Sequence, residues 1–423
     1  MISSRIPGFY NLSPEERAKK VVEFANLTEN DISILQSVLP LDDADRMIEN
    51  VIGSFSLPYG IATNFLINGK DYLIPMVIEE PSVVAAASNA ARLARNNFGF
   101  MAEATDPVMI GQIQVKTDMP QFSRLKILGH KEEILKIANE QDQVLKKLGG
   151  GAVDLSCRII DDYLVVHLLV NVKDAMGANI VNTMCESVAS KIEELTDGKV
   201  ILRIISNLAV ERLAHARAVF GKDDIGGSDI VDRIISATDL ANSDPFRCAT
   251  HNKGIMNGID ALVIATGNDF RAVESGAHAY ASLGGYHSLT SWEKTMDGDL
   301  AGSIELPMPV GVIGGGTMSP YARLSFKILG VKTSTELSCV AASLGLAQNF
   351  AALRALVSEG IQKGHMRLHA KNIVKIAMDN LVSEDVDYAA KFSDKAIIDK
   401  VSDLLVKEGS INVNRAKEIL KDV

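Results

Sequence analysis

The stretch from about Pro107 to Leu208 limits the possible folds most, because strand and helix patterns follow one another there in a recognisable order. The pattern predicts strand, helix, strand, strand, helix and strand, over residues 109–115, 131–148, 155–160, 163–172, 176–195 and 200–205. The order βαββαβ is that of a split-βαβ, or ferredoxin-like, unit. We therefore predict one compact α+β unit in the middle of the chain.

The second helix of this unit begins with the residues DAMGAN. We expect Asp174 to cap the helix, Gly177 and Ala178 to allow close approach, and Asn179 and Asn182 to offer amide donors. A small-residue helix N-terminus favours anions, so a cofactor pyrophosphate could bind there. Tight packing of the helix on the sheet explains the same small residues equally well.

Outside this unit, cap and turn signals place further elements. They predict a helix from Ser13 to about Ala25, a second near Thr28, a third ending near Gly53, a hairpin through Asn68-Gly69, a helix over 83–95, helices over 228–242 and 269–282, a long apolar helix over 333–358, and three short amphipathic helices after 371. The last of these segments has few large apolar residues, so we expect it to be mobile.

The stretch from Arg247 to Arg271 combines polar groups with an apolar run. Lys253 precedes residues that are apolar enough to be buried, which predicts a desolvated lysine with Asp269 as a compensating carboxylate. Alternatively, Lys253 extends to solvent from a helix end, and Asn268 or Asp269 is an ordinary cap.

Two further segments offer groups that can exchange protons. Glu79 and Glu80 precede a helix that is small and apolar on nearly every face, which implies burial and a raised carboxyl pKa, although carboxylates at a helix start also complement its dipole. His365 follows Gly364 and suggests a titratable group at a hinge. His365 and His369 have no third ligand nearby in the sequence, so we predict no metal site.

Composition excludes several classes of protein. The 423 residues carry a net charge of -10 and no basic run, which argues against a nucleic-acid partner. Four cysteines without a CxxC spacing indicate neither disulfides nor zinc, and a reducing cytoplasm fits best. We find no signal peptide and no membrane-spanning run of about 18 apolar residues.

Several long motifs, taken in order, resemble those of 3-hydroxy-3-methylglutaryl-coenzyme A (HMG-CoA) reductase, specifically its soluble class II. They are ENVIG, EEPSVVAAAS, DAMGAN, SNLA, RCATHNKGIMNGID, ATGNDFR, GLAQN and EGIQKGHM. The resemblance implies an α/β (α+β) fold: a large domain in two parts (1–106 and 211–360), interrupted by a ferredoxin-like NAD-binding domain (107–210), with a C-terminal helical flap (361–423). It also implies a cytoplasmic homodimer or higher homo-oligomer with active sites at the subunit interface.

The same resemblance assigns roles to individual residues. The catalytic residues would be Glu80, Lys253, Asp269 and His365. The substrate would be held by Ser82, Arg247 and Asn257, with Arg247 on its free carboxylate. The cofactor would contact Asp142, Asp174, Met176, Gly177, Ala178, Asn179, Asn207 and Gln348. Asp142 falls where NAD-preferring members have an acid, which favours NAD(H) over NADP(H) because a carboxylate repels a 2′-phosphate.

The implied reaction interconverts HMG-CoA with mevalonate and coenzyme A by two hydride transfers. Lys253 would stabilise the oxyanion, Glu80 would move the proton, Asp269 would fix their protonation states, and His365 would protonate the departing thiolate. Two alternatives are a CoA-thioester hydrolase or lyase, which leaves the DAMGAN helix unexplained, and a non-catalytic binding protein. The sequence leaves open whether mevalonate is made or degraded.

Overall fold

The computed structural model describes residues 3–35, 39–358, 361–384 and 395–422. The chain forms two compact units. The first comprises Met1–Ile78 and Val84–Ala351, and the second comprises Glu79–Val83 and Ala352–Val423.

The first unit contains a six-stranded sheet in the order β2-β1-β3-β8-β10-β9. Its strands are β1 (Tyr59–Ile67), β2 (Lys70–Val77), β3 (Phe100–Ala104), β8 (Leu213–Phe220), β9 (Thr290–Lys294) and β10 (Leu300–Pro307). The β1–β3 pair is parallel and the other pairs are antiparallel. The predicted hairpin through Asn68-Gly69 is confirmed, because both residues have positive φ and join β1 to β2.

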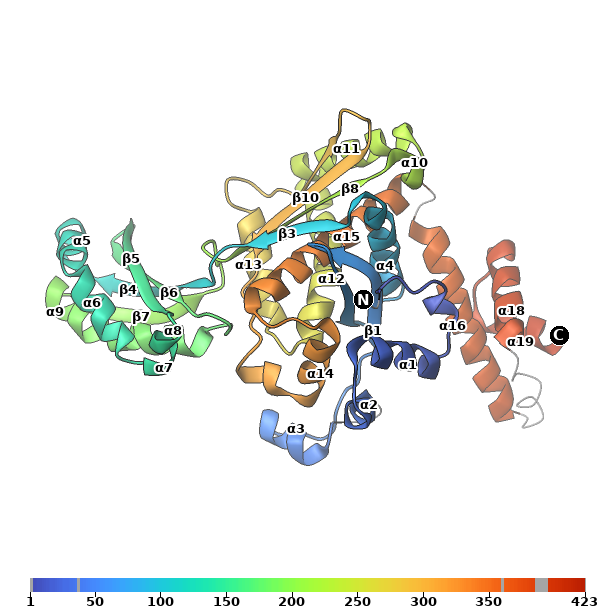
Figure 1. The fold of residues 1–423 in the computed structure, drawn as a ribbon, viewed down its shortest axis with the longest axis horizontal. Helices are drawn as coiled ribbons and strands as arrows, with labels where there is room; N and C mark the ends of the chain where they lie inside the picture. Colours follow the sequence, from blue (N-terminus) through green and yellow to red (C-terminus); the bar gives the residue numbers. More distant parts are fainter. Residues whose placement is uncertain (1–2, 36–38, 359–360, 385–394, 423) are drawn as a thin grey trace. The chain divides into compact units, whose positions relative to one another are not determined.

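The chain leaves this sheet after β3 and returns to it in β8, which pairs with β3 so that Phe100 lies opposite Ala218. The part of the sequence between β3 and β8 forms a second sheet, with four strands in the order β5-β6-β4-β7 (Figure 1). These strands are β4 (Val108–Lys116), β5 (Gly151–Ile160), β6 (Tyr163–Asn171) and β7 (Lys199–Ser206), and all their pairs are antiparallel. The predicted order of strands is confirmed, and its pairing is that of a ferredoxin-like sheet.

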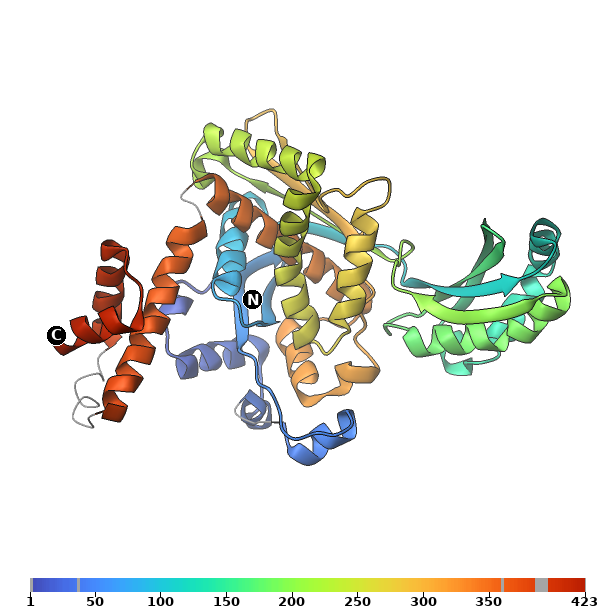
Figure 2. The same cartoon turned by 180° about the vertical axis from the view of Figure 1, so that it is seen from behind.

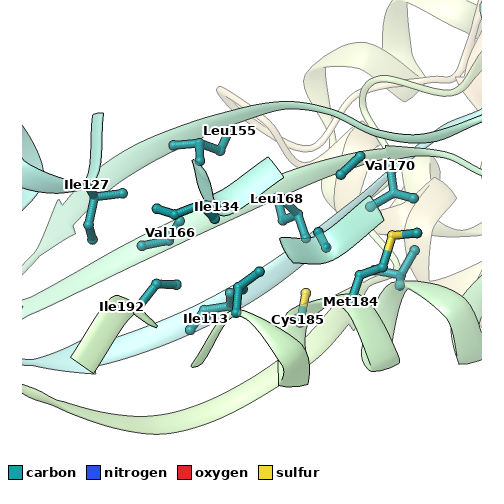
Figure 3. Packing of buried hydrophobic residues seen from close by; sticks show 14 of the residues in the cluster. Ile113, Ile127, Ile134, Leu155, Val166, Leu168, Val170, Met184, Cys185 and Ile192 are labelled. Carbon is teal, nitrogen blue, oxygen red and sulfur yellow. The ribbon is translucent and has the colours of Figure 1, made fainter. Parts of the chain in front are cut away.

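The four-stranded sheet has a hydrophobic core of its own. Alternate residues of β4 and β6, such as Ile113 and Leu168, meet Ile134, Met184 and side chains from the other covering helices (Figure 3). Those helices are α5 (Pro120–Gly129), α6 (Lys131–Asn139), α7 (Gln143–Lys147), α8 (Ala178–Ser187) and α9 (Ala189–Thr196).

Both predicted helices of this region are shorter than expected. The helix predicted over 131–148 is interrupted, because Asp142 adopts an extended conformation and caps α7 as a new helix. The helix predicted over 176–195 is divided at Val188 into α8 and α9. Helix α5, which begins at Pro120, was not predicted.

Helices pack on the six-stranded sheet and on one another. They are α4 (Val83–Ala94), α10 (Lys222–Ile225), α11 (Ser228–Ser243), α12 (Pro245–Ala265), α13 (Phe270–Ala281), α14 (Pro320–Leu329) and α15 (Ser334–Val357), with short 3-10 turns at Arg95–Asn97 and Gly315–Met318. Helices α11, α12 and α13, yellow-green to yellow in Figure 2, pack in sequence. Predicted helices over 228–242, 269–282 and 333–358 are confirmed.

Helix α15 is long and apolar enough to span a membrane, which the sequence analysis did not expect. In this fold, 67% of its most apolar window is buried. Its Gly345 lies against Ile259 of α12 and Ile304 of β10, and its Phe350 stacks on Phe220 of β8 with ring centroids 3.7 Å apart. Helix α15 is therefore a core helix of this structure.

The N-terminal segment holds a 3-10 turn at Phe9–Asn11 and helices α1 (Pro14–Ala25), α2 (Glu29–Leu35) and α3 (Leu41–Met47). The predicted capping box is confirmed, since the Ser13 hydroxyl accepts from the Glu16 N–H and the Glu16 carboxylate accepts from the Ser13 N–H. Helix α3 ends at Met47, well before the predicted end near Gly53.

The second unit contains α16 (Ile361–Glu384), α18 (Lys395–Glu408) and α19 (Val413–Asp422). Helix α16 has 24 residues and is longer than the short helices predicted here. These helices share a small core that includes Val374, Leu381, Val401, Leu405 and Leu420. The second unit therefore has a hydrophobic core of its own.

Candidate active site

Helix α12 positions three of the predicted site residues. It begins where the Asp244 carboxylate accepts a hydrogen bond from the Arg247 N–H at 3.0 Å, and Pro245 occupies its first turn. Lys253 lies in the middle of the helix, so the alternative is wrong about its position at a helix end, although its side chain does extend to solvent. Asn257 follows one turn later on the same face.

The side chain of Lys253 is exposed, so the prediction of a desolvated lysine is wrong for the single chain. The reason is the helical period: Ile255 and Ile259 are buried on other sides of α12, while Lys253 lies on a face that these two residues leave free. The apolar run was identified correctly, but it does not surround the lysine.

The predicted partner Asp269 is the N-cap of α13. Its Oδ1 accepts hydrogen bonds from the N–H groups of Arg271 and Ala272 at 3.1 and 3.2 Å, and the Arg271 guanidinium lies 3.3 Å away. The side chain remains 44% exposed. The capping function considered for Asp269 is therefore present.

Three buried or half-buried groups beneath Lys253 were not predicted. Glu274 of α13 accepts a hydrogen bond from His278 Nε2 at 3.0 Å, and it is hydrogen-bonded to Asp260 of α12. Burial alone would raise the pKa of Glu274, but the hydrogen bonds of His278 and Asp260, and then the charges of His278 and Lys253, outweigh burial and lower that pKa. The available sequence signal was the spacing of Glu274 and His278, four residues apart on one helix face.

The other side of α12 is anchored by buried polar residues. His251 is 2% exposed, and its Nε2 lies 2.7 Å from the Ser288 hydroxyl and 3.0 Å from the Asn349 amide. Burial lowers the pKa of His251 to about 4, so this imidazole is neutral near neutral pH. Asn252 donates to the His287 carbonyl and accepts from the Leu289 N–H. These bonds fix the rotation of α12 and hence the direction of its exposed face.

Arg247 is half-buried, and burial lowers the pKa of its guanidinium. Among the residues that the structure describes, no carboxylate forms an ion pair with Arg247. A half-buried guanidinium of this kind is a suitable partner for a carboxylate of a ligand.

Glu80 and Ser82 lie in the segment that connects β2 to α4. Glu80 is half-buried, while Glu79 is exposed. Ser82 has φ +74°, a left-handed conformation that is uncommon for serine and is often found at functional sites. The expected burial of α4 on nearly every face is wrong: Ala85, Asn89 and Arg92 are exposed, because one side of the helix faces open space in the single chain.

His365 lies in α16, but its side chain and that of His369 are outside the described part of the structure. Within that described part, no three His, Cys, Asp or Glu side chains are grouped as metal ligands.

The predicted cofactor residues of DAMGAN lie at the start of α8. The cap is Gly177, with φ +100°, and not Asp174 as predicted. The Asp174 carboxylate instead accepts a hydrogen bond from the Ser334 N–H at 2.8 Å, which links this loop to the start of α15. Met176 and Ala178 are half-buried on either side of the glycine.

The close approach predicted for Gly177 is confirmed, since a Cβ there would lie 2.5 Å from Val172 Cγ1. Asn179 is exposed in the first turn of α8. Asn182, predicted as an amide donor, accepts a hydrogen bond from the Ile205 N–H and so ties α8 to β7. The first N–H groups of α8 are suited to an anion, as at any helix start.

The remaining cofactor candidates lie apart from α8. Asp142 Oδ1 accepts from the N–H groups of Val144 and Leu145 as the cap of α7. Asn207 is exposed just after β7. Gln348 is only 5% exposed and packs against Gly258 of α12, adjacent in sequence to Asn257. The structure therefore places Gln348 beside the helix that carries Lys253.

The chain matches known proteins over most of its length. A family model described as hydroxymethylglutaryl-coenzyme A reductase matches residues 13–370. The 3-hydroxy-3-methylglutaryl-coenzyme A reductase of Archaeoglobus fulgidus is 59% identical, over 99% of this chain and 95% of that protein. A probable enzyme of the same name from Borreliella burgdorferi is 35% identical, over 88% of each.

Solved structures give the same result. The class II 3-hydroxy-3-methylglutaryl-CoA reductase of Streptococcus pneumoniae, bound to NADPH in open conformations, is similar with a TM-score of 0.81 and 42% identity, over 83% of this chain and 99% of that one. A second structure of the Streptococcus pneumoniae enzyme has a TM-score of 0.82 at 38% identity, over 98% of this chain and 99% of that one.

Proposed function

The chain belongs to the hydroxymethylglutaryl-coenzyme A reductase family, and from that premise we propose which of its residues carry out the reaction. The enzyme is an oxidoreductase that uses a nicotinamide cofactor to interconvert HMG-CoA with mevalonate and coenzyme A. The alternative of a CoA-thioester hydrolase or lyase has no support in these matches.

Lys253 is the group that stabilises negative charge on the reacting oxygen. The bound nicotinamide supplies or accepts hydride, so the protein must neutralise the charge that develops on the carbonyl oxygen at each step. The observation that supports this role best is the fixed position of Lys253 on α12, where the preceding residues His251 and Asn252 are buried and hydrogen-bonded to the surrounding structure. A rotationally fixed helix directs the ammonium group without reorganisation during the reaction.

The other catalytic groups manage protons. Glu80 supplies or removes the proton of the reacting oxygen, and Asp269 fixes the protonation states of its neighbours through its partly exposed carboxylate. His365 protonates the coenzyme A thiolate as it leaves, because an imidazole titrates near neutral pH. Ser82 and Asn257 hold the substrate, and Arg247 binds its free carboxylate, for which its half-buried guanidinium is suited.

The nicotinamide cofactor is assigned to the loop Asp174 to Asn179 and the start of α8, where Gly177 brings the backbone close to Val172, the residue after β6. NAD(H) is the preferred cofactor because Asp142 places a negative charge where a 2′-phosphate would otherwise be tolerated. The Streptococcus pneumoniae relative binds NADPH, which makes this preference the most informative one to test. Asn207 and Gln348 complete the assigned contacts.

We also infer a cytoplasmic homodimer or higher homo-oligomer. The segment after α3 supports this proposal, because its large apolar side chains Ile48, Ile52 and Phe55 are exposed in the single chain. We keep the domain boundaries that the sequence suggests: a large domain (1–106 and 211–360), a small domain (107–210) and a flap (361–423). The separate core of the four-stranded sheet supports the small domain. Light scattering of the purified protein measures its mass in solution, and a monomer would refute the oligomer.

The decisive experiment follows nicotinamide absorbance after HMG-CoA is added to the protein and NADH, with release of coenzyme A measured in parallel. We expect cofactor oxidation and thiol release together, in a ratio of about two cofactors per thiol, because the reaction takes two hydrides. Thiol release without cofactor oxidation would indicate a hydrolase or lyase. No change in either signal would indicate a binding protein.

A further inference from the structure

Two carboxyl groups lie against each other beneath the exposed face of α12. Asp260 is two helical turns after Lys253 on the same face, and Glu274 is on the neighbouring helix α13. Their side chains are hydrogen-bonded to each other, and both residues are half-buried. Among the described residues, no donor group reaches Asp260 Oδ1 or Glu274 Oε2, although both atoms are buried. A hydrogen bond between two carboxyl groups requires a proton on one of them, because ionised carboxylates only accept.

The surroundings determine which carboxyl group carries that proton. Glu274 receives a hydrogen bond from His278 Nε2 at 3.0 Å and lies near the charge of Lys253, and both favour its ionised form. Burial, and then the hydrogen bond and charge of Glu274, raise the pKa of Asp260. The pair therefore consists of a neutral Asp260 that donates to an ionised Glu274.

The hydrogen bonds continue away from Lys253. His278 contacts the Glu274 carboxylate through Nε2, and its Nδ1 lies 2.7 Å from the Tyr286 hydroxyl, within hydrogen-bond distance. Tyr286 is in turn hydrogen-bonded to the Asn252 side chain, which anchors α12 from its buried side. The chain of bonds joins α12, α13 and the loop after α13.

We propose that Asp260 and Glu274 share one proton and act as a positioning pair for Lys253, with Glu274 as the fixed negative charge that directs the ammonium group and Asp260 as the neutral donor that holds Glu274 in place. This inference rests on the proposed role of Lys253 and extends it. Neither residue needs to touch the substrate, so both are positioning residues.

Several charged or titratable groups surround Glu274. The charged or titratable groups facing Glu274 are Lys253 and Asp260 from α12 and His278 from its own helix. Tyr286 faces it from the loop, and Cys248 of α12 faces Tyr286. Glu305 of β10, which packs on α13, is bonded to Tyr280 and His215 instead.

The two residues should respond differently to isosteric substitution. Asp260→Asn keeps a neutral donor to Glu274, so we expect kcat within about threefold of wild type. Glu274→Gln removes the negative charge beside Lys253, so we expect kcat to fall by roughly tenfold or more while KM for HMG-CoA changes little, because a displaced catalytic group affects the chemical step. Glu305→Gln, which removes a carboxylate bonded to the same helix α13, is the matched control and should leave kcat unchanged.

The proton itself is measurable without turnover. Wild type should show the infrared carbonyl stretch of a buried protonated carboxyl group near neutral pH, and Asp260→Asn should lack it. The pKa of Asp260 is higher in the folded state than in the unfolded state. The resulting contribution to the free energy of unfolding is fully present below the pKa of the unfolded state and is lost progressively as the pH rises towards the pKa of the folded state. The melting temperature of Asp260→Asn relative to wild type should therefore rise between about pH 4 and about pH 8.

Each outcome distinguishes between explanations. If Lys253→Ala retains turnover, the proposed function of Lys253 fails, whatever the pair does. If Lys253→Ala is inactive but Glu274→Gln keeps wild-type kcat, only the positioning pair is refuted. Equal loss in Asp260→Asn and Glu274→Gln, or an unchanged infrared spectrum in Asp260→Asn, would refute the assignment of the proton to Asp260. Should Glu274→Gln fail to fold, Glu274→Asp provides the kinetic test, since a shortened carboxylate keeps the charge but moves it, and an unchanged kcat would then count against the pair.

Discussion

Lys253 combines an exposed side chain with a rigid attachment. Its neighbours His251 and Asn252 are buried and hydrogen-bonded to residues 287–290 and to α15, so the backbone that carries the lysine has little freedom. An ammonium group stabilises an oxyanion most strongly where water is excluded. We therefore expect bound substrate, and not the folded single chain, to provide the shielding that the sequence analysis assigned to the apolar run.

Replacing Lys253 by Ala tests the oxyanion role. We expect turnover to fall by about 10²–10³ or more, because a preorganised charge partner acts mainly in the transition state. Binding of HMG-CoA, measured by calorimetry, should remain mostly intact. Lys294→Ala, which removes a surface lysine paired with Asp232, is the control. Turnover of Lys253→Ala within tenfold of wild type would remove this residue from the chemistry.

Substitution of Asp142 tests the cofactor preference. Because Asp142 also caps α7, the substitution has to keep a capping oxygen. Because its Oδ1 caps α7, Asp142→Ala would also cost about 1 kcal/mol of helix stability. Asp142→Asn keeps a capping oxygen and removes the charge, so only the repulsion of a 2′-phosphate is lost. We expect the ratio of kcat/KM for NADH to that for NADPH to fall. An unchanged ratio would mean that another residue discriminates between the two cofactors.

At the scale of elements, the start of α8 is defined by backbone geometry more than by its polar side chains. Asp174 looked like the cap from its residue type, yet the glycine three positions later takes that place because only glycine tolerates both the positive φ and the contact with Val172. Asp174 is then free to bind the Ser334 N–H. The loop is thus joined to α15 as well as to α8.

Replacing Gly177 by Ala should disturb this loop. The added Cβ would lie 2.5 Å from Val172 Cγ1 at a residue with φ +100°, so we expect a loss of about 1–3 kcal/mol in the free energy of unfolding. The KM for the nicotinamide cofactor should rise, because the loop supplies its proposed contacts. Gly129→Ala in α5, where nothing lies within 4 Å of the new atom, should leave both quantities unchanged. A stable Gly177→Ala with normal cofactor KM would place the cofactor elsewhere.

Sequence patterns predicted the elements where one local signal dominates. Asn68-Gly69 defined the hairpin, and Ser13 with Glu16 defined α1, because turns and capping boxes are local structures. The break at Asp142 was missed because the apolar stripe continues through it from α6 into α7. Asp260 and Glu274 were missed for another reason: their proximity depends on how α12 and α13 pack, which no spacing within one helix reveals.

At the scale of the whole molecule, the proposed catalytic residues are distributed over both units of the chain. Lys253 and Asp269 belong to the first unit, whereas Glu80 and His365 belong to the second. The second unit has its own small core, built around Val374, Leu381 and Leu405. The proposed chemistry therefore draws on residues from two units, and each unit has its own packed residues.

Truncation after Gly360 tests this division. The long helix α15 and both sheets precede the cut, so we expect the shortened chain to remain folded and to keep its oligomeric state, as judged by circular dichroism and light scattering. Catalysis should nonetheless fail, because His365 is removed. A truncated protein that reduces HMG-CoA at the normal rate would exclude every residue after Gly360 from the reaction, whereas one that does not fold would show that the second unit supports the first.

His365→Gln in the full-length chain separates a chemical role from a structural one. Reduction of HMG-CoA must expel a thiolate, which needs a proton, whereas reduction of free mevaldehyde expels no leaving group. We therefore expect the substitution to slow the first reaction by a larger factor than the second, with both rates measured from nicotinamide absorbance at saturating cofactor. Added imidazole at a pH near its own pKa should partly restore the first reaction if only a proton donor is missing. Equal slowing of the two reactions would instead assign His365 to closure of the segment, and the proton would then have to come from another group or from water.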